Sequence, residues 1–175
     1  MSLKFKQAVS CLRYAGPLAR AVVLWKYENH RYLSDVLALL MVDWAADSAP
    51  KWFDSIQAVV PAPQHPKTLD RRGFSPPEEL ASRLACAFSL PYLPRVLYKI
   101  RETEPQARLS RDARTSNIKD SMMVFDSSLV DGKTILVVDD VMTTGATVNE
   151  CARALRISGA ASVYCLTLAR QADCA

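Results

Sequence analysis

The sequence predicts an α/β fold in which a central, mostly parallel sheet is covered by helices on both faces. Short apolar runs that suit buried strands alternate with longer stretches of helical periodicity. One such strand, 135–138, ends at two adjacent carboxylates, Asp139 and Asp140, and a turn of small residues then leads into an amphipathic helix. Because ligands of parallel sheets bind at the carboxyl ends of the strands, we expect the functional site at this edge.

The N-terminal part of the chain is expected to form two helices. Pro17 begins an apolar stripe at helical spacing, and a second stripe spans 33–44. The segment 64–77 is polar, basic and Pro-rich, and is expected to be a mobile loop. We expect the region of about 1–50 and this loop to supply a small hood, and the chain 1–175 to be a single domain.

The rest of the chain continues the alternation of strands and helices. Gly159 is placed to end the helix after the turn in a left-handed conformation. The expected helices lie at 78–88 and after the turn, with a helical turn at 110–117. The expected strands lie at 56–60, within 92–100, at 122–125, at 135–138 and at 162–168.

Composition limits the classes of function. A net charge of +4 suits an anionic small molecule and does not exclude nucleic acid. No apolar run reaches the length of a membrane span, and the N-terminus lacks the apolar core of a signal peptide, so a cytoplasmic location is expected. The five cysteines form no Cys-x-x-Cys pair and have no histidine at ligand spacing, which argues against zinc and for free thiols.

The turn after the acidic pair suits a phosphorylated sugar. The first N–H groups of a helix have no partner within the helix, so the turn can hold a phosphate. The carboxylates of Asp139 and Asp140 can accept hydrogen bonds from sugar hydroxyls, or lie near a Mg²⁺ that carries other phosphates. The alternative is that the pair only caps a turn. The residues of the turn are Thr143, Thr144, Gly145, Ala146 and Thr147.

This run resembles the phosphoribosyl-pyrophosphate (PRPP) binding motif of type I phosphoribosyltransferases. That motif has a hydrophobic strand, two acidic residues, an apolar pair (here Val141 and Met142) and a Thr/Gly/Ser-rich loop. The resemblance implies the type I fold and Mg²⁺-dependent transfer of ribose 5-phosphate from PRPP to a nitrogen acceptor. It also implies that 143–147 holds the 5-phosphate, while Asp139 and Asp140 take the ribose hydroxyls and stabilise the charge that develops on the ring.

The same resemblance implies where the pyrophosphate would lie. In this family the turn after the first buried strand offers backbone N–H groups, and only Ala62 of Pro61-Ala62-Pro63 has one, so Gln64 or His65 is an alternative. Guanidinium groups bind phosphate oxygens bidentately, and closure of 64–77 would exclude water. An ordinary strand exit and a solvated basic loop remain open as interpretations. The candidate guanidinium groups are those of Arg71, Arg72 and Arg114.

A narrower resemblance is to the ComF/GntX branch of this superfamily. It rests on Arg72-Gly73-Phe74 and Lys26-Tyr27, and on five residues at the spacing of the branch, Thr103, Gln106, Leu109, Arg114 and Asn117. The branch is linked to natural competence and DNA uptake, or to gluconate utilisation. Two features depart from it: Ser75-Pro76 replaces Asn-Gln, and the Cys-rich, zinc-finger-like segment often found upstream is not in this sequence.

Two other functions remain open. The protein could bind PRPP or a related nucleotide without turnover, as an accessory factor in DNA uptake, because few residues follow Leu168 to recognise a base. Direct binding of single-stranded nucleic acid is less favoured, since it needs a basic groove with exposed aromatic rings. Its candidates are Arg71, Arg72, Phe74, Arg108, Arg111 and Arg114. The acceptor and the oligomeric state stay open.

Overall fold

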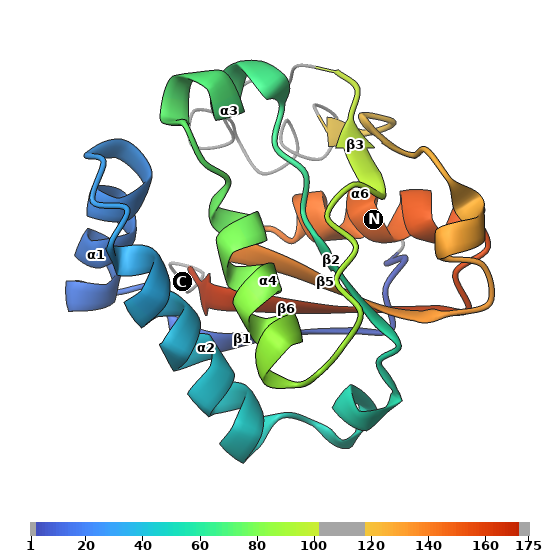
Figure 1. Cartoon of the computed structure of the whole chain (residues 1–175), viewed down its shortest axis with the longest axis horizontal. Coiled ribbons are helices and arrows are strands. Elements are labelled where there is room, and N and C mark those ends of the chain that lie inside the picture. The colour runs from blue at the N-terminus through green and yellow to red at the C-terminus, as the bar shows by residue number, and fades with distance from the viewer. Residues whose placement is uncertain (1–2, 102–117, 172–175) are drawn as a thin grey trace.

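A four-stranded parallel sheet lies at the centre of the protein (Figure 1). The computed structural model describes residues 3–101 and 118–171. The strand order is β1-β6-β5-β2, and every neighbouring pair is parallel. The predicted α/β class and parallel sheet are therefore confirmed. The strands are β1 (Gln7–Arg13), β2 (Ala58–Pro61), β5 (Thr134–Met142) and β6 (Ser162–Arg170).

Helices cover both faces of this sheet (Figure 1). One face carries α1 (Gly16–Tyr27), α2 (Leu33–Ser48) and α4 (Pro76–Ala87), packed on β5 side chains such as Leu136 and Val138. The other face carries α6 (Ala146–Ile157) and a small antiparallel sheet of β3 (Leu97–Lys99) and β4 (Met122–Val124), packed on Ile135 and Val137. Neighbouring residues of β5 thus enter different layers, as the alternation of a strand requires.

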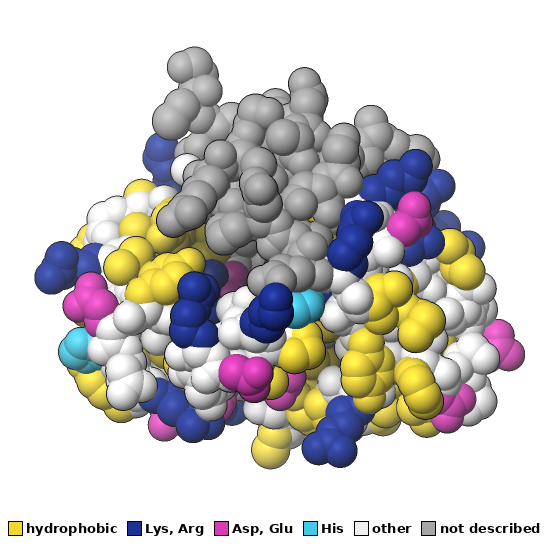
Figure 2. Space-filling model, turned by 90° about the horizontal axis from the view of Figure 1, so that it is seen from above, with side chains coloured by type: hydrophobic (Ala, Val, Ile, Leu, Met, Phe, Trp, Pro, Cys, Tyr) yellow, Lys and Arg dark blue, Asp and Glu magenta, His cyan; other side chains and the backbone are white. Residues whose placement is uncertain are grey.

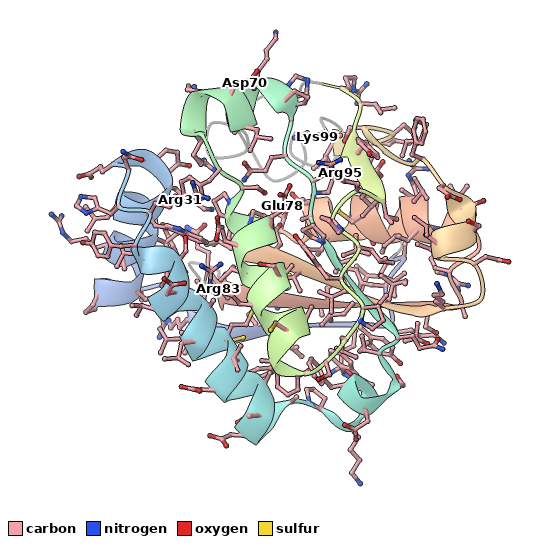
Figure 3. All side chains as sticks on the ribbon, in the orientation of Figure 1. Arg31, Asp70, Glu78, Arg83, Arg95 and Lys99 are labelled. Carbon is pink, nitrogen blue, oxygen red and sulfur yellow. The ribbon has the colours of Figure 1, made fainter. Side chains whose placement is uncertain are left out.

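Charged side chains tie α4 to α2 and to the segment that joins α1 and α2. Arg83 pairs with Asp35 of α2 and with Glu79 of its own helix, and Arg31 Nη2 lies 2.8 Å from Glu79 Oε1. Figure 3 labels Arg31 and Arg83. Such partly exposed pairs contribute about 1 kcal/mol or less each. Their effect here is to hold the start of α4, and with it the segment after β2, against the α1–α2 layer.

The first 50 residues differ from the prediction. β1 was not predicted, and it pairs with β6 as an edge strand of the central sheet. The predicted helices are present as α1 and α2, and α2 packs against α4 on the sheet. This segment therefore contributes a strand and a covering layer to the main body, where we had expected part of a hood.

The segment 64–77 is a second difference. It contains α3 (Pro66–Arg72), which begins after His65 and ends at Gly73 in the left-handed conformation. The His65 ring accepts a hydrogen bond from the Lys67 N–H at 3.3 Å. The predicted irregular loop is wrong, because Pro at the first helical position and Gly just past the last are helix start and stop signals.

Most other elements agree with the sequence. The strand expected at 135–138 continues to Met142, so the acidic pair lies inside β5. Gly159 has a φ of 97° after α6, as predicted. The helical turn expected at 110–117 lies outside the described residues. Within the described part of the chain, no helix has both the length and the apolar character needed to cross a bilayer.

Candidate functional site

The acidic pair lies in the last part of β5, near the carboxyl edge of the sheet. Because consecutive residues of a strand point to opposite faces, Asp139 and Asp140 enter different layers. Asp139 faces α6 and β3, where its charge acts on Cys151 and Lys99. Asp140 is 7% exposed and faces α1. The two carboxylates therefore have separate surroundings.

Asp140 is held by an ion pair with Lys26 of α1. Lys26 Nζ lies 2.6 Å from Asp140 Oδ1, and the two side chains are 14% and 9% exposed. The same oxygen accepts a hydrogen bond from the Val141 N–H. A buried carboxylate is costly unless it is paired and hydrogen-bonded, and Asp140 meets both conditions. The last turn of α1 thus forms one wall of the site.

Asp139 is half-buried and has a different balance of charges. Its Oδ1 accepts a hydrogen bond from the Asp140 N–H at 2.8 Å. Burial, and then the charge of Asp140, raises the pKa of Asp139 to about 7, while Lys26 and Lys99 act in the opposite direction. Burial in turn lowers the pKa of Lys99, which β3 places above the sheet (Figure 3). Asp139 is thus poised to exchange a proton, or to accept a hydroxyl hydrogen bond, near neutral pH.

The predicted phosphate turn lies beside Asp139. Gly145 precedes α6 with a φ of 77°, a left-handed conformation that favours glycine. Thr144 Oγ1 is 3.4 Å from the Ala146 N–H, and the residues of the turn are half-buried except Ala146, which is buried. A cavity of about 10 Å³ is lined by Asp139, Val141, Met142, Val148 and the turn residues Thr143, Gly145, Ala146 and Thr147. The carboxylate and the helix start therefore share one small space.

The structure corrects the assignment of Ala62 to the pyrophosphate. The Ala62 N–H donates to the Val138 carbonyl at 2.8 Å, which continues the pairing of β2 with β5, and Ala62 is 2% exposed. This N–H is therefore not available to a ligand. Of the alternatives, His65 caps α3, and Gln64 is half-buried with an Oε1 that has no hydrogen-bond partner in the described structure.

The basic tip of α3 docks on the end of α1. The Arg72 guanidinium lies over the Tyr27 ring, 5.3 Å from its centroid, whereas Arg71 is exposed. The ring centroids of the buried Phe74 and of Trp25 are 5.9 Å apart, and the Arg31 guanidinium lies 5.4 Å from the Phe74 centroid. Arg114 and the other four spaced residues of the branch pattern lie outside the described residues.

Two cations of the site were not assigned a role from the sequence. In the sequence, Lys26 is distinguished only as part of the Lys26-Tyr27 pair that resembles the branch. No sequence pattern distinguishes Lys99, which lies in a short strand next to an exposed tyrosine. Among residues 3–101 and 118–171 there is no cluster of three or more side chains that could ligate a metal ion.

Comparison with known proteins places this site in a family. The phosphoribosyl transferase domain matches residues 68–175. Competence protein F of Haemophilus influenzae is 26% identical over 159 residues, which cover 90% of this chain and 69% of that protein. DNA utilization protein YhgH of Salmonella typhimurium is 29% identical over 167 residues, covering 95% and 73%.

Among solved structures, the glutamine PRPP amidotransferase from B. subtilis, complexed with ADP and GMP, is similar over 77% of this chain and 26% of that chain, with 22% identity and a TM-score of 0.49. The domain match spans more than half of the sequence. The chain therefore belongs to the phosphoribosyl transferase domain family, in its ComF/GntX branch.

Proposed function

We propose that this protein binds PRPP and transfers its ribose 5-phosphate group to a nitrogen acceptor. The observation that carries the proposal is the shared cavity of Asp139 and the turn that begins α6. An acceptor for sugar hydroxyls and a place for a phosphate lie next to each other there. The family of the chain supports the same ligand.

The 5-phosphate would lie on the turn 143–147. The positive end of the α6 dipole and the first N–H groups of the helix favour an anion at this place. The left-handed Gly145 lets the chain turn sharply from β5 into the helix, and Thr143 in this turn lines the same cavity as Asp139. The cavity itself is too small for a phosphate, so the ligand would rest on the exposed side of the turn.

Asp139 would accept hydrogen bonds from the ribose hydroxyls. Its negative charge would stabilise the positive charge that develops on the ring as the bond to pyrophosphate breaks. The exposed Arg71, the Arg72 guanidinium on Tyr27, and Arg114 are the proposed partners of the leaving pyrophosphate. Mg²⁺ is proposed as the cofactor, and when bound it would neutralise phosphate oxygens. The carboxylate of Asp139, which lines the cavity beside the turn, fits this role if the phosphates of PRPP supply most of the ligands.

A second candidate is binding of PRPP or a nucleotide without turnover, in support of DNA uptake. One observation favours it: the relatives are named competence protein F and DNA utilization protein YhgH. Direct binding of single-stranded DNA is less favoured. On the face shown in Figure 2, the described Lys and Arg side chains lie in separate groups among hydrophobic and acidic ones.

Calorimetric titration with PRPP and Mg²⁺ tests the binding site. We expect the wild type to bind and Asp139→Asn to lose binding, whereas Asp47→Asn, at an exposed position of α2, serves as the matched control. Release of pyrophosphate with a panel of bases and amines then separates the two candidates. If the protein binds PRPP but releases pyrophosphate with none of these acceptors, the accessory role is supported. A folded wild type that does not bind PRPP refutes both candidate functions.

A further inference from the structure

The two carboxylates of the pair are held in different ways. The carboxylate of Asp140 forms an ion pair with the Lys26 ammonium and accepts a hydrogen bond from the Val141 N–H, so both of these partners belong to the protein itself. Asp140 does not line the cavity beside the turn. Asp139 does line it, and the Asp140 N–H donates to one of its oxygens. The adjacent residues therefore have unequal access to a ligand on the turn.

We propose that Lys26 is a positioning residue, which holds Asp140 as a neutralised internal carboxylate so that Asp139 alone presents a free carboxylate to the ligand. This inference rests on the proposed binding of PRPP. It assigns a role to the Lys26-Tyr27 pair, and it divides the roles of the two aspartates, which the sequence had treated as equivalent.

The charges of the site explain why such a residue is needed. PRPP is a polyanion, and two uncompensated carboxylates beside the turn would repel it. Lys26 compensates Asp140 from the helical layer, and Lys99 lies in the field of Asp139 from the layer of β3. Two cations from opposite faces thus balance two carboxylates that point to opposite faces.

The burial of Lys26 argues for an internal role. Its side chain is 14% exposed, and its ammonium lies at hydrogen-bond distance from Asp140. The next residue, Tyr27, lies under the Arg72 guanidinium at the end of α3. One end of α1 therefore fixes both the acidic pair on β5 and the basic tip of α3, so that the two walls of the site are set relative to each other.

A double-mutant cycle on PRPP affinity tests the proposal. Lys26→Met leaves the Asp140 charge uncompensated, and we expect affinity to fall roughly a hundredfold, the effect of one unit charge a few ångströms from an anion. Asp140→Asn should keep affinity within about tenfold of the wild type, and Lys26→Met/Asp140→Asn should recover to about the wild-type level, because both charges of the pair are removed together. Asp139→Asn should lose binding.

The controls separate this role from simpler ones. Lys51→Met removes the same charge at an exposed position far from β5 in sequence and should bind like the wild type. Lys26→Gln, which keeps a donor for Asp140, replaces the Met variant if that variant does not fold. A double variant as weak as Lys26→Met would show direct contact of Lys26 with the ligand and overturn the proposal.

A Lys26→Met variant that binds like the wild type would also overturn it, even if its melting temperature falls. A folded wild type that binds no PRPP would instead refute the proposed function, and the role of Lys26 with it. The two failures are therefore distinguished by the wild-type titration alone.

Discussion

Replacement of Asp139 by Asn should make the protein more stable while it removes ligand binding. Asn has nearly the same shape, and its Oδ1 can still accept the hydrogen bond from the Asp140 N–H, which is 2.8 Å long in the wild type. What the substitution removes is a half-buried negative charge next to a second one. Sites of this kind commonly sacrifice stability for function.

The size of the effect follows from the pKa of Asp139. Burial and the Asp140 charge raise it to about 7, from an ordinary value near 4. Between these values the folded protein holds a proton that the unfolded chain has lost, so the wild type loses stability as the pH rises, and the loss is complete above about 7. The whole shift corresponds to roughly 4 kcal/mol, and with partial access of water we expect about 2 kcal/mol.

Urea denaturation of both proteins at several pH values from about 4 to 8 measures this effect, with the metal-free proteins in a chelator. The difference in free energy of unfolding, Asp139→Asn minus wild type, should be near zero at pH 4 and grow to about 2 kcal/mol in favour of Asn above pH 7. A difference that stays constant with pH would refute the reasoning, because it would show that Asp139 titrates alike in the folded and unfolded chain.

Three further predictions concern stability and can be checked by denaturation. Gly159→Ala should cost about 2 kcal/mol, because φ is 97° and the exposed Asp131 side chain must move away from the new Cβ, whereas Gly73→Ala, also left-handed but with open space around it, should cost about 1 kcal/mol. Ser34→Ala should cost about 1–2 kcal/mol, because it leaves the buried Trp25 Nε1–H without its acceptor. A double-mutant cycle of Tyr27→Leu and Arg72→Gln should give a coupling of about 0.5–1 kcal/mol.

The elements that the sequence predicted well are those with an apolar side fixed by local spacing. The stripes that begin at Pro17 and near Leu33 became α1 and α2, and the run 135–138 became the buried part of β5. In these segments the apolar residues that repeat in the sequence are the ones that the fold buries, so the pattern alone predicts the element. The turn of small residues before α6 was also predicted, and Gly145 adopts there the left-handed conformation that favours glycine.

Elements that have no continuous apolar side were not predicted from the sequence. β1 lies at the edge of the sheet, where its residues are mostly half-buried or exposed, so its alternation of polar and apolar residues is weak. α3 has no buried residue, and its Pro66 and Gly73 were interpreted as loop residues although they are also helix boundary signals. The N–H of Ala62 was assigned to a ligand because the sequence does not show that the neighbouring strand already uses it.

The contact between Lys26 and Asp140 shows where reasoning from local sequence stops. An acidic pair in a motif suggests two groups that act together, yet two consecutive residues of an extended strand must face opposite layers. One of them then needs a cation from the layer it enters, and that cation can come from any distance along the chain. Here it comes from α1, far upstream of β5. The N-terminal segment therefore belongs to the site through one ammonium group, although the motif itself begins more than a hundred residues later.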